Sequence, residues 1–148
     1  MWVKDEGKRP TDPMITKAWD KNPDGAGIAW REPAQDGDGL EVVWKKGLTL
    51  EEIRHLCHEL PLPYIVHFRV ASSGGVRPSL THPFPVSSTI PNTTEGRTKG
   101  FVLFHNGDWK GWADAAREAV LRTRTPIGTG SWSDSRAIAW LCSIYGLG

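Results

Sequence analysis

The centre of the chain begins with a mostly apolar segment, residues 64–70, whose pattern predicts a β-strand. Within it, His67 and Arg69 alternate with apolar residues, so the two polar side chains share one face of the strand. The segment opens into a loop of small residues, Ser72-Ser73-Gly74-Gly75, and closes on Thr81-His82-Pro83-Phe84. An arginine at the end of a strand, followed by small residues and a histidine, indicates a site that holds an anion.

The other elements follow from hydrophobic spacing and from residues that begin or end helices. Helices are expected where a capping residue precedes apolar positions at helical spacing, and strands where short apolar runs lie between turns. The stretch 87–99 has no periodicity and predicts a mobile loop or a long hairpin. The expected helices are 12–20 with Asp12 as N-cap, 50–60 after the capping box at Thr49, 109–124, and the last one from the N-cap Ser133; the expected strands are 2–4, 27–30, 40–45, 64–70 and 100–104.

This mixture of strands and helices, joined by hairpins rather than by regular βαβ units, predicts an α+β fold with a largely antiparallel sheet. The 148 residues are expected to form one domain, because 39% are hydrophobic and the length suits a single core. The net charge of +1 gives no electrostatic reason to expect nucleic-acid binding. No apolar run approaches the roughly 20 residues that cross a bilayer, and no signal peptide opens the chain, so we expect a cytoplasmic protein without a membrane partner.

Cysteine and histidine spacing excludes the common metal sites. Cys57 and Cys142 both lie in apolar helical patterns and are expected to be buried, reduced thiols. His55 and His58 stand three residues apart, but no third ligand is near, so both are expected to face solvent or to be partly packed. We therefore expect neither a metal nor a cofactor.

Three groups of residues could bind or react with a small molecule. Arg69 carries a planar fork that matches a carboxylate, although a salt bridge within the protein would explain it too. Asp134 lies in the first turn of a helix, where the dipole stabilises its charge, and it could be no more than a helix-start carboxylate. Asn106 and Gly107 could supply an amide group and an unhindered N–H to an oxyanion hole, or could form a simple hairpin turn.

Four motifs occur in a fixed order: NPDGAGIAW from Asn22, HFRVASSGG followed by THPFP, FHNGDW and SDS. In this order they resemble the class II glutamine amidotransferases, the N-terminal-nucleophile family, and above all the short stand-alone versions of bacteriophage and bacterial genomes. The resemblance runs from about Asn22 to the end of the chain.

The resemblance implies a four-layer αββα sandwich of two mostly antiparallel sheets, truncated here at both ends. It implies hydrolysis of the glutamine side-chain amide to glutamate and ammonia, with L-glutamine as the ligand. The ammonia acceptor would be water or an enzyme on a separate chain, and a homo-oligomer is left open. By resemblance, Arg69 would hold the α-carboxylate of glutamine, Asp134 the α-amino group, and Asn106 with Gly107 the oxyanion; Ser72, Ser73, Gly74 and His82 would complete the substrate-binding wall.

In this family the base is the free α-amine of the nucleophile, so His67, His82 and His105 are expected to be supporting or structural residues. The nucleophile itself, a cysteine at the amino terminus, is missing, because residue 2 is Trp and the two cysteines lie mid-helix. The chain as written should therefore be inactive or nearly so.

Three explanations compete for the missing cysteine. The sequence is short at its start, or the protein is a non-catalytic relative that binds glutamine or another amino acid, or the fold serves as a structural protein with a relic pocket. The first is favoured because Arg69, Asn106, Gly107 and Asp134 are all present.

Overall fold

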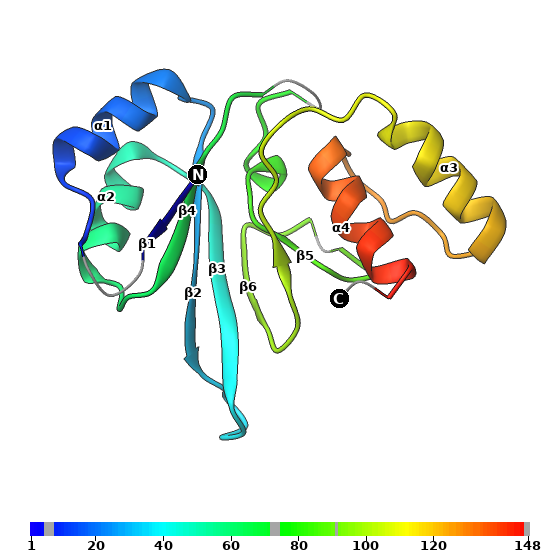
Figure 1. The fold of residues 1–148 in the computed structure, drawn as a ribbon, viewed down its shortest axis with the longest axis horizontal. Coiled ribbons are helices and arrows are strands. Elements are labelled where there is room, and N and C mark those ends of the chain that lie inside the picture. Colours follow the sequence, from blue (N-terminus) through cyan, green and yellow to red (C-terminus); the bar gives the residue numbers. More distant parts are fainter. Residues whose placement is uncertain (5–7, 72–74, 91, 147–148) are drawn as a thin grey trace.

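The computed structural model describes residues 1–4, 8–71, 75–90 and 92–146. Helices and strands are mixed along this part of the chain, with hairpins between neighbouring strands (Figure 1). The elements are β1 (Trp2–Lys4), α1 (Asp12–Lys21), β2 (Ala26–Pro33), β3 (Leu40–Leu48), α2 (Leu50–Glu59), β4 (Tyr64–Phe68), the 3₁₀ turn η1 (Pro78–Leu80), β5 (Phe84–Pro85), β6 (Glu95–Thr98), β7 (Val102–Leu103), α3 (Trp112–Thr123) and α4 (Asp134–Ile144).

The strands form two antiparallel sheets. The larger has the order β1-β4-β2-β3-β6, and the smaller consists of β5 and β7. Strands β2 and β3 form a long hairpin, in which Trp30 lies opposite Val43, and β4 pairs with the other edge of β2. The expected α+β class with antiparallel sheets is confirmed.

One hydrophobic core lies between the larger sheet and the first two helices. Helices α1 and α2 lie together on one side of that sheet (Figure 1). Alternate residues of the strands face them, so period-2 strands and amphipathic helices share one apolar layer. The buried residues of this core are Ile15, Ala26, Ile28, Trp30, Val43, Ile53, Cys57, Tyr64, Val66 and Phe68.

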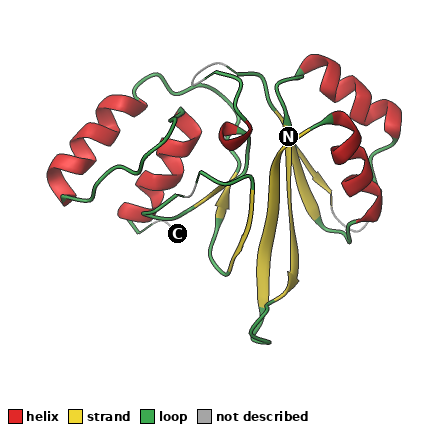
Figure 2. Cartoon of the chain, turned by 180° about the vertical axis from the view of Figure 1, so that it is seen from behind, coloured by secondary structure: helices red, strands yellow, loops and turns green. Residues whose placement is uncertain are grey.

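A second core lies on the opposite side, where α3 and α4 pack against each other and α4 contacts the smaller sheet (Figure 2). Its buried residues are Leu80, Phe84, Ile90, Ala116, Ala119, Ala139 and Trp140. The two helix pairs therefore lie at opposite ends of the molecule with the strands between them.

Most expected elements are present, with shifted ends. The capping box at Thr49 and the N-cap at Ser133 are confirmed, but α1 is preceded by Thr11 rather than Asp12 as its N-cap. Helix α3 begins at Trp112, three residues later than expected, and β7 covers only two residues of the expected strand 100–104.

Two expectations about strands need correction. The strand expected over 64–70 ends at Phe68, and Val70 is exposed. The stretch 87–99, expected to be a mobile loop or a long hairpin, contains β6, which pairs with β3 and places Arg97 opposite Val43. An edge strand is held by backbone hydrogen bonds to its neighbour, which do not require alternating apolar residues. The polar sequence of β6 therefore did not predict a strand.

Candidate functional site

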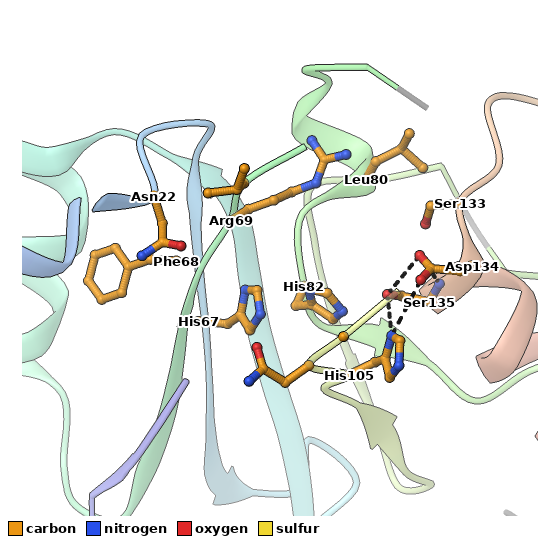
Figure 3. Close-up of a pocket in the computed structure, with 13 residues that line it drawn as sticks. Asn22, His67, Phe68, Arg69, Leu80, His82, His105, Ser133, Asp134 and Ser135 are labelled. Atoms are coloured by element: carbon orange, nitrogen blue, oxygen red, sulfur yellow. Dashed lines mark hydrogen bonds and ion pairs between the residues drawn. The ribbon is translucent and has the colours of Figure 1, made fainter. Parts of the chain in front are cut away.

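A cavity of about 150 Å³ opens where the two halves of the protein meet (Figure 3). Cavities of roughly this volume can take up a small organic molecule. Its walls come from the end of β4, the segments before β5 and after β7, the start of α4, and the turn after α1. The lining residues are Asn22, His67, Phe68, Arg69, Val70, Leu80, His82, His105, Asn106, Gly107, Ser133, Asp134 and Ser135.

Backbone hydrogen bonds hold Arg69 directly after the end of β4. Its N–H donates to the Gly25 carbonyl at 2.9 Å, and its carbonyl accepts the N–H of Asp24 at 3.0 Å. The guanidinium Nη2 donates to the Gly75 carbonyl at 2.9 Å, and the residue is 5% exposed. Burial lowers the pKa of Arg69, while the carboxylates of Asp24 and Asp134 oppose that change. The group remains a cation with a fixed direction.

Asp134 lies on the opposite wall, in the first turn of α4. The Ser133 hydroxyl begins that helix by accepting the N–H of Arg136 at 3.3 Å. One Asp134 carboxylate oxygen, Oδ2, accepts the backbone N–H of Trp109 at 3.0 Å, and Oδ1 accepts the N–H of Ser135 at 2.8 Å. A carboxylate offers about four acceptor positions, so these bonds leave capacity for a further donor.

Two histidines form the floor between these walls. The ring centroids of His67 and His82 are 4.1 Å apart, and both residues are 6% exposed. Burial lowers the pKa of His67 to about 4, helped by the N-terminal ammonium and Arg69. Burial and the neighbouring His67 likewise hold the pKa of His82 well below its usual range. Both rings are therefore neutral near pH 7, and within the described residues neither nitrogen of His82 has a hydrogen-bond partner.

His105, Asn106 and Gly107 come from the segment after β7. The Nδ1 atom of His105 lies 3.1 Å from the Ser135 hydroxyl and 3.7 Å from Asp134 Oδ2. Asn106 and Gly107 are exposed at the rim, and Gly107 has a φ of 132°, a conformation that favours glycine. The rim thus offers an amide side chain and a backbone N–H that no Cβ shields.

The structure brings most of the predicted site residues to this one cavity. Arg69, His82, Asn106, Gly107 and Asp134 all line it. Ser72, Ser73 and Gly74, which were also predicted to bind the substrate, lie outside the described residues. These five residues come from four separate segments of the chain, so only the tertiary fold joins them.

The cavity also includes residues to which the sequence assigned no ligand-binding role. His67 and His105 were expected to be supporting or structural, yet both line the wall. Their positions carried a signal, since His67 alternates with Arg69 and His105 immediately precedes Asn106. Asn22 and Ser135 were parts of motifs without a stated function, and nothing in the pattern identified Leu80.

Neither cysteine lines the cavity. Cys57 is fully buried in α2, where burial raises the pKa of its thiol to about 11, and Cys142 is half-buried in α4. The prediction that Cys142 is buried is therefore only partly correct. His55 and His58 are exposed as expected, and His58 lies 2.7 Å from Asp12. Across the described ranges, no group of three or more histidine, cysteine or acidic side chains is arranged to hold a metal ion.

The amino terminus lies beside the cavity. Met1 lines an adjoining depression together with Asn22, Phe68 and Asn106, three residues that also line the main cavity. Strand β1 explains this position, because Trp2 pairs with Val66, one residue before His67. The α-amino group is close enough for its charge to lower the pKa of His67.

Comparison with known proteins finds no matching family model, no matching curated protein and no matching solved structure. No helix in the described stretches is both long enough and apolar enough to span a bilayer.

Proposed function

We propose that the cavity binds L-glutamine and that the chain carries the substrate-binding half of a class II glutamine amidotransferase site. The observation that supports this most is a pair of opposite charges on facing walls of one small cavity, the Arg69 guanidinium and the Asp134 carboxylate (Figure 3). A free amino acid is a zwitterion with the complementary charges on one carbon atom.

Each end of the amino acid has a suited partner. The α-carboxylate pairs with Arg69, whose fork suits two parallel hydrogen bonds. The α-ammonium donates to Asp134, which keeps acceptor capacity after its bonds to Trp109 and Ser135. The side-chain amide then lies toward Asn106 and Gly107, whose amide group and N–H suit the charge that develops on the amide oxygen.

The arrangement of the elements agrees with this proposal. Two helix pairs and two antiparallel sheets, the second of only two short strands, support the proposal of a four-layer αββα sandwich. The proposal is also supported by the amino terminus, because Met1 lines a depression that shares Asn22, Phe68 and Asn106 with the cavity.

The reaction would also need a cysteine thiol, and none of the described residues that line the cavity is a cysteine. In the proposed family a thiolate attacks the amide carbon, ammonia leaves, and water hydrolyses the thioester to glutamate. For the residues that line the cavity we therefore propose binding of glutamine, with turnover dependent on that thiol. Any ammonia acceptor would be water or an enzyme on another chain.

Calorimetric titration with L-glutamine tests the proposal. We expect millimolar or tighter binding, about −4 kcal/mol or better, to the protein and none of comparable strength with D-glutamine. Arg69→Lys keeps the charge but loses the fork, so it should weaken binding at least tenfold.

Arg97→Lys is the matched control, because Arg97 is bonded to Glu32 and Glu41 on the sheet and does not line the cavity. It should bind like the unchanged protein. Absence of heat in the folded, unchanged protein would refute glutamine binding and would favour a structural role for the fold.

A further inference from the structure

The three histidines of the cavity differ in their surroundings. His67 and His82 pack ring against ring and are almost fully buried. The His105 side chain is 23% exposed, and its Nδ1 faces two oxygen atoms at the start of α4, Ser135 Oγ and Asp134 Oδ2 (Figure 3). Hydrogen-bonding groups at the start of α4 therefore set the orientation of the His105 ring.

The Ser135 hydroxyl has one proton and two neighbours that could accept it. Its Oγ lies 3.4 Å from Asp134 Oδ1 and 3.1 Å from His105 Nδ1. A carboxylate can only accept, whereas a neutral imidazole can present either N–H or a lone pair at Nδ1. The arrangement that satisfies all three groups has Ser135 donating to Asp134 and His105 donating from Nδ1 to Ser135. Nε2 then carries the lone pair of the ring.

The same two residues of α4 hold both ends of the segment 105–109. Ser135 contacts His105 at one end, and Asp134 accepts the backbone N–H of Trp109 at the other. Asn106 and Gly107 lie between these two attachments. Gly107 is also next to the ring, since a Cβ added to it would come 3.7 Å from His105 Nε2.

We propose that Ser135 is a positioning residue, which holds His105 as the Nδ1–H tautomer and thereby fixes Asn106 and Gly107 for the side-chain amide of the ligand. The first half of the proposal, the His105 tautomer, concerns the protein alone. The second half, the positioning of Asn106 and Gly107, rests on the proposed function, because it names the part of glutamine that these residues contact.

Nitrogen-15 NMR of the histidine rings tests the first half without any ligand. In the unchanged protein, His105 should show the shifts of an Nδ1–H tautomer. Ser135→Ala should move the ring toward the commoner Nε2–H form, and Ser135→Thr, which keeps the hydroxyl, should restore the original pattern.

Ser133→Ala is the matched control, because it removes the hydroxyl that caps the same helix, whereas the described hydrogen bond of His105 is to Ser135. It should lower thermal stability and leave the His105 tautomer unchanged. If Ser135→Ala does not fold, Ser135→Cys keeps the shape with a weaker hydrogen-bonding group and should show the same tautomer shift. An unchanged tautomer in a folded Ser135 variant without the hydroxyl overturns the proposal.

Glutamine titration tests the second half and separates the two proposals. Ser135→Ala should bind glutamine about tenfold more weakly than the unchanged protein, as expected when a buried hydrogen bond is lost. Equal affinity in the two proteins would overturn the role of Ser135 while leaving glutamine binding intact. Absence of binding in the unchanged protein would refute the proposed function, and the tautomer measurement would still decide the first half.

Discussion

His67 and His82 lie with their ring centroids 4.1 Å apart at the floor of the cavity, tilted by 47° to each other. His67 lies in β4 of the larger sheet, and His82 precedes β5 of the smaller sheet. Both have lowered pKa values because burial disfavours their protonated forms. This pair therefore joins the two halves of the molecule through neutral rings and makes their packing sensitive to acid.

Acid should destabilise the protein through this pair. The folded pKa of His67 is about 4, below its ordinary value of 6.5, so the unfolded state binds more protons between these pH values. The free energy of unfolding is therefore unaffected by His67 above about pH 6.5. It falls by about 3 kcal/mol through this residue as the pH falls toward 4. His82 acts in the same direction.

Urea unfolding at pH 7 and pH 4.5 measures this loss. The double variant His67→Gln and His82→Gln should lose clearly less stability between the two pH values than the unchanged protein. Equal losses would show that neither ring is held neutral by the fold.

A buried lysine should respond to pH on the alkaline side. Lys46 in β3 is 2% exposed, its amine lies 4.3 Å from the centre of the Phe84 ring, and burial lowers its pKa to about 7. The unfolded state binds more protons between pH 7 and 10.5, so stability should rise with pH across this window. Below pH 7 the charged, buried amine lowers the free energy of unfolding by roughly 5 kcal/mol.

Lys46→Met should therefore raise the free energy of unfolding at pH 7 by about 2 kcal/mol or more and remove most of that pH dependence. The adjacent Lys45→Met is the control, because the Lys45 side chain is 44% exposed and forms a salt bridge with Glu95 at 3.6 Å. A Lys46→Met protein less stable than the Lys45→Met protein would contradict the prediction.

Gly27 should tolerate no side chain. A Cβ at this position would overlap the carbonyl oxygen of His82, which is backbone and cannot rotate away. Gly27→Ala should cost about 3 kcal/mol or more, as overpacking of a buried backbone contact does. Gly128→Ala, where a Cβ would meet nothing within 4 Å, should change the thermal midpoint little. Similar midpoints for the two variants would mean that the sheets separate easily at His82.

A cysteine at the amino terminus should turn binding into catalysis. Met1→Cys, made by placing a cysteine codon between the initiator methionine and Trp2, puts a thiol and a free α-amine next to His67 and Asn106. We expect release of glutamate and ammonia from L-glutamine. Met1→Ala, made in the same way, should release neither. A folded Met1→Cys protein that binds glutamine without turnover would refute the amidotransferase reaction but not glutamine binding.

Local sequence determined the elements that depend on neighbouring residues. The capping box at Thr49, the N-cap at Ser133 and the β2–β3 hairpin follow from short-range hydrogen bonds and hydrophobic periods, so the pattern predicts them well. Alternation over the predicted strand 64–70 also placed His67 and Arg69 on one face, and both line the same cavity. The residues of the candidate site were therefore largely visible in the sequence.

Only the tertiary structure decided how those residues meet. Asp134 and Arg69 lie 65 positions apart, and their shared cavity exists because α4 packs beside the smaller sheet while β4 lies in the larger one. Contacts between distant segments also bury His82 and Lys46 and bring the backbone N–H of Trp109 to Asp134. Such effects come from long-range packing, which no local pattern of apolar and polar residues specifies.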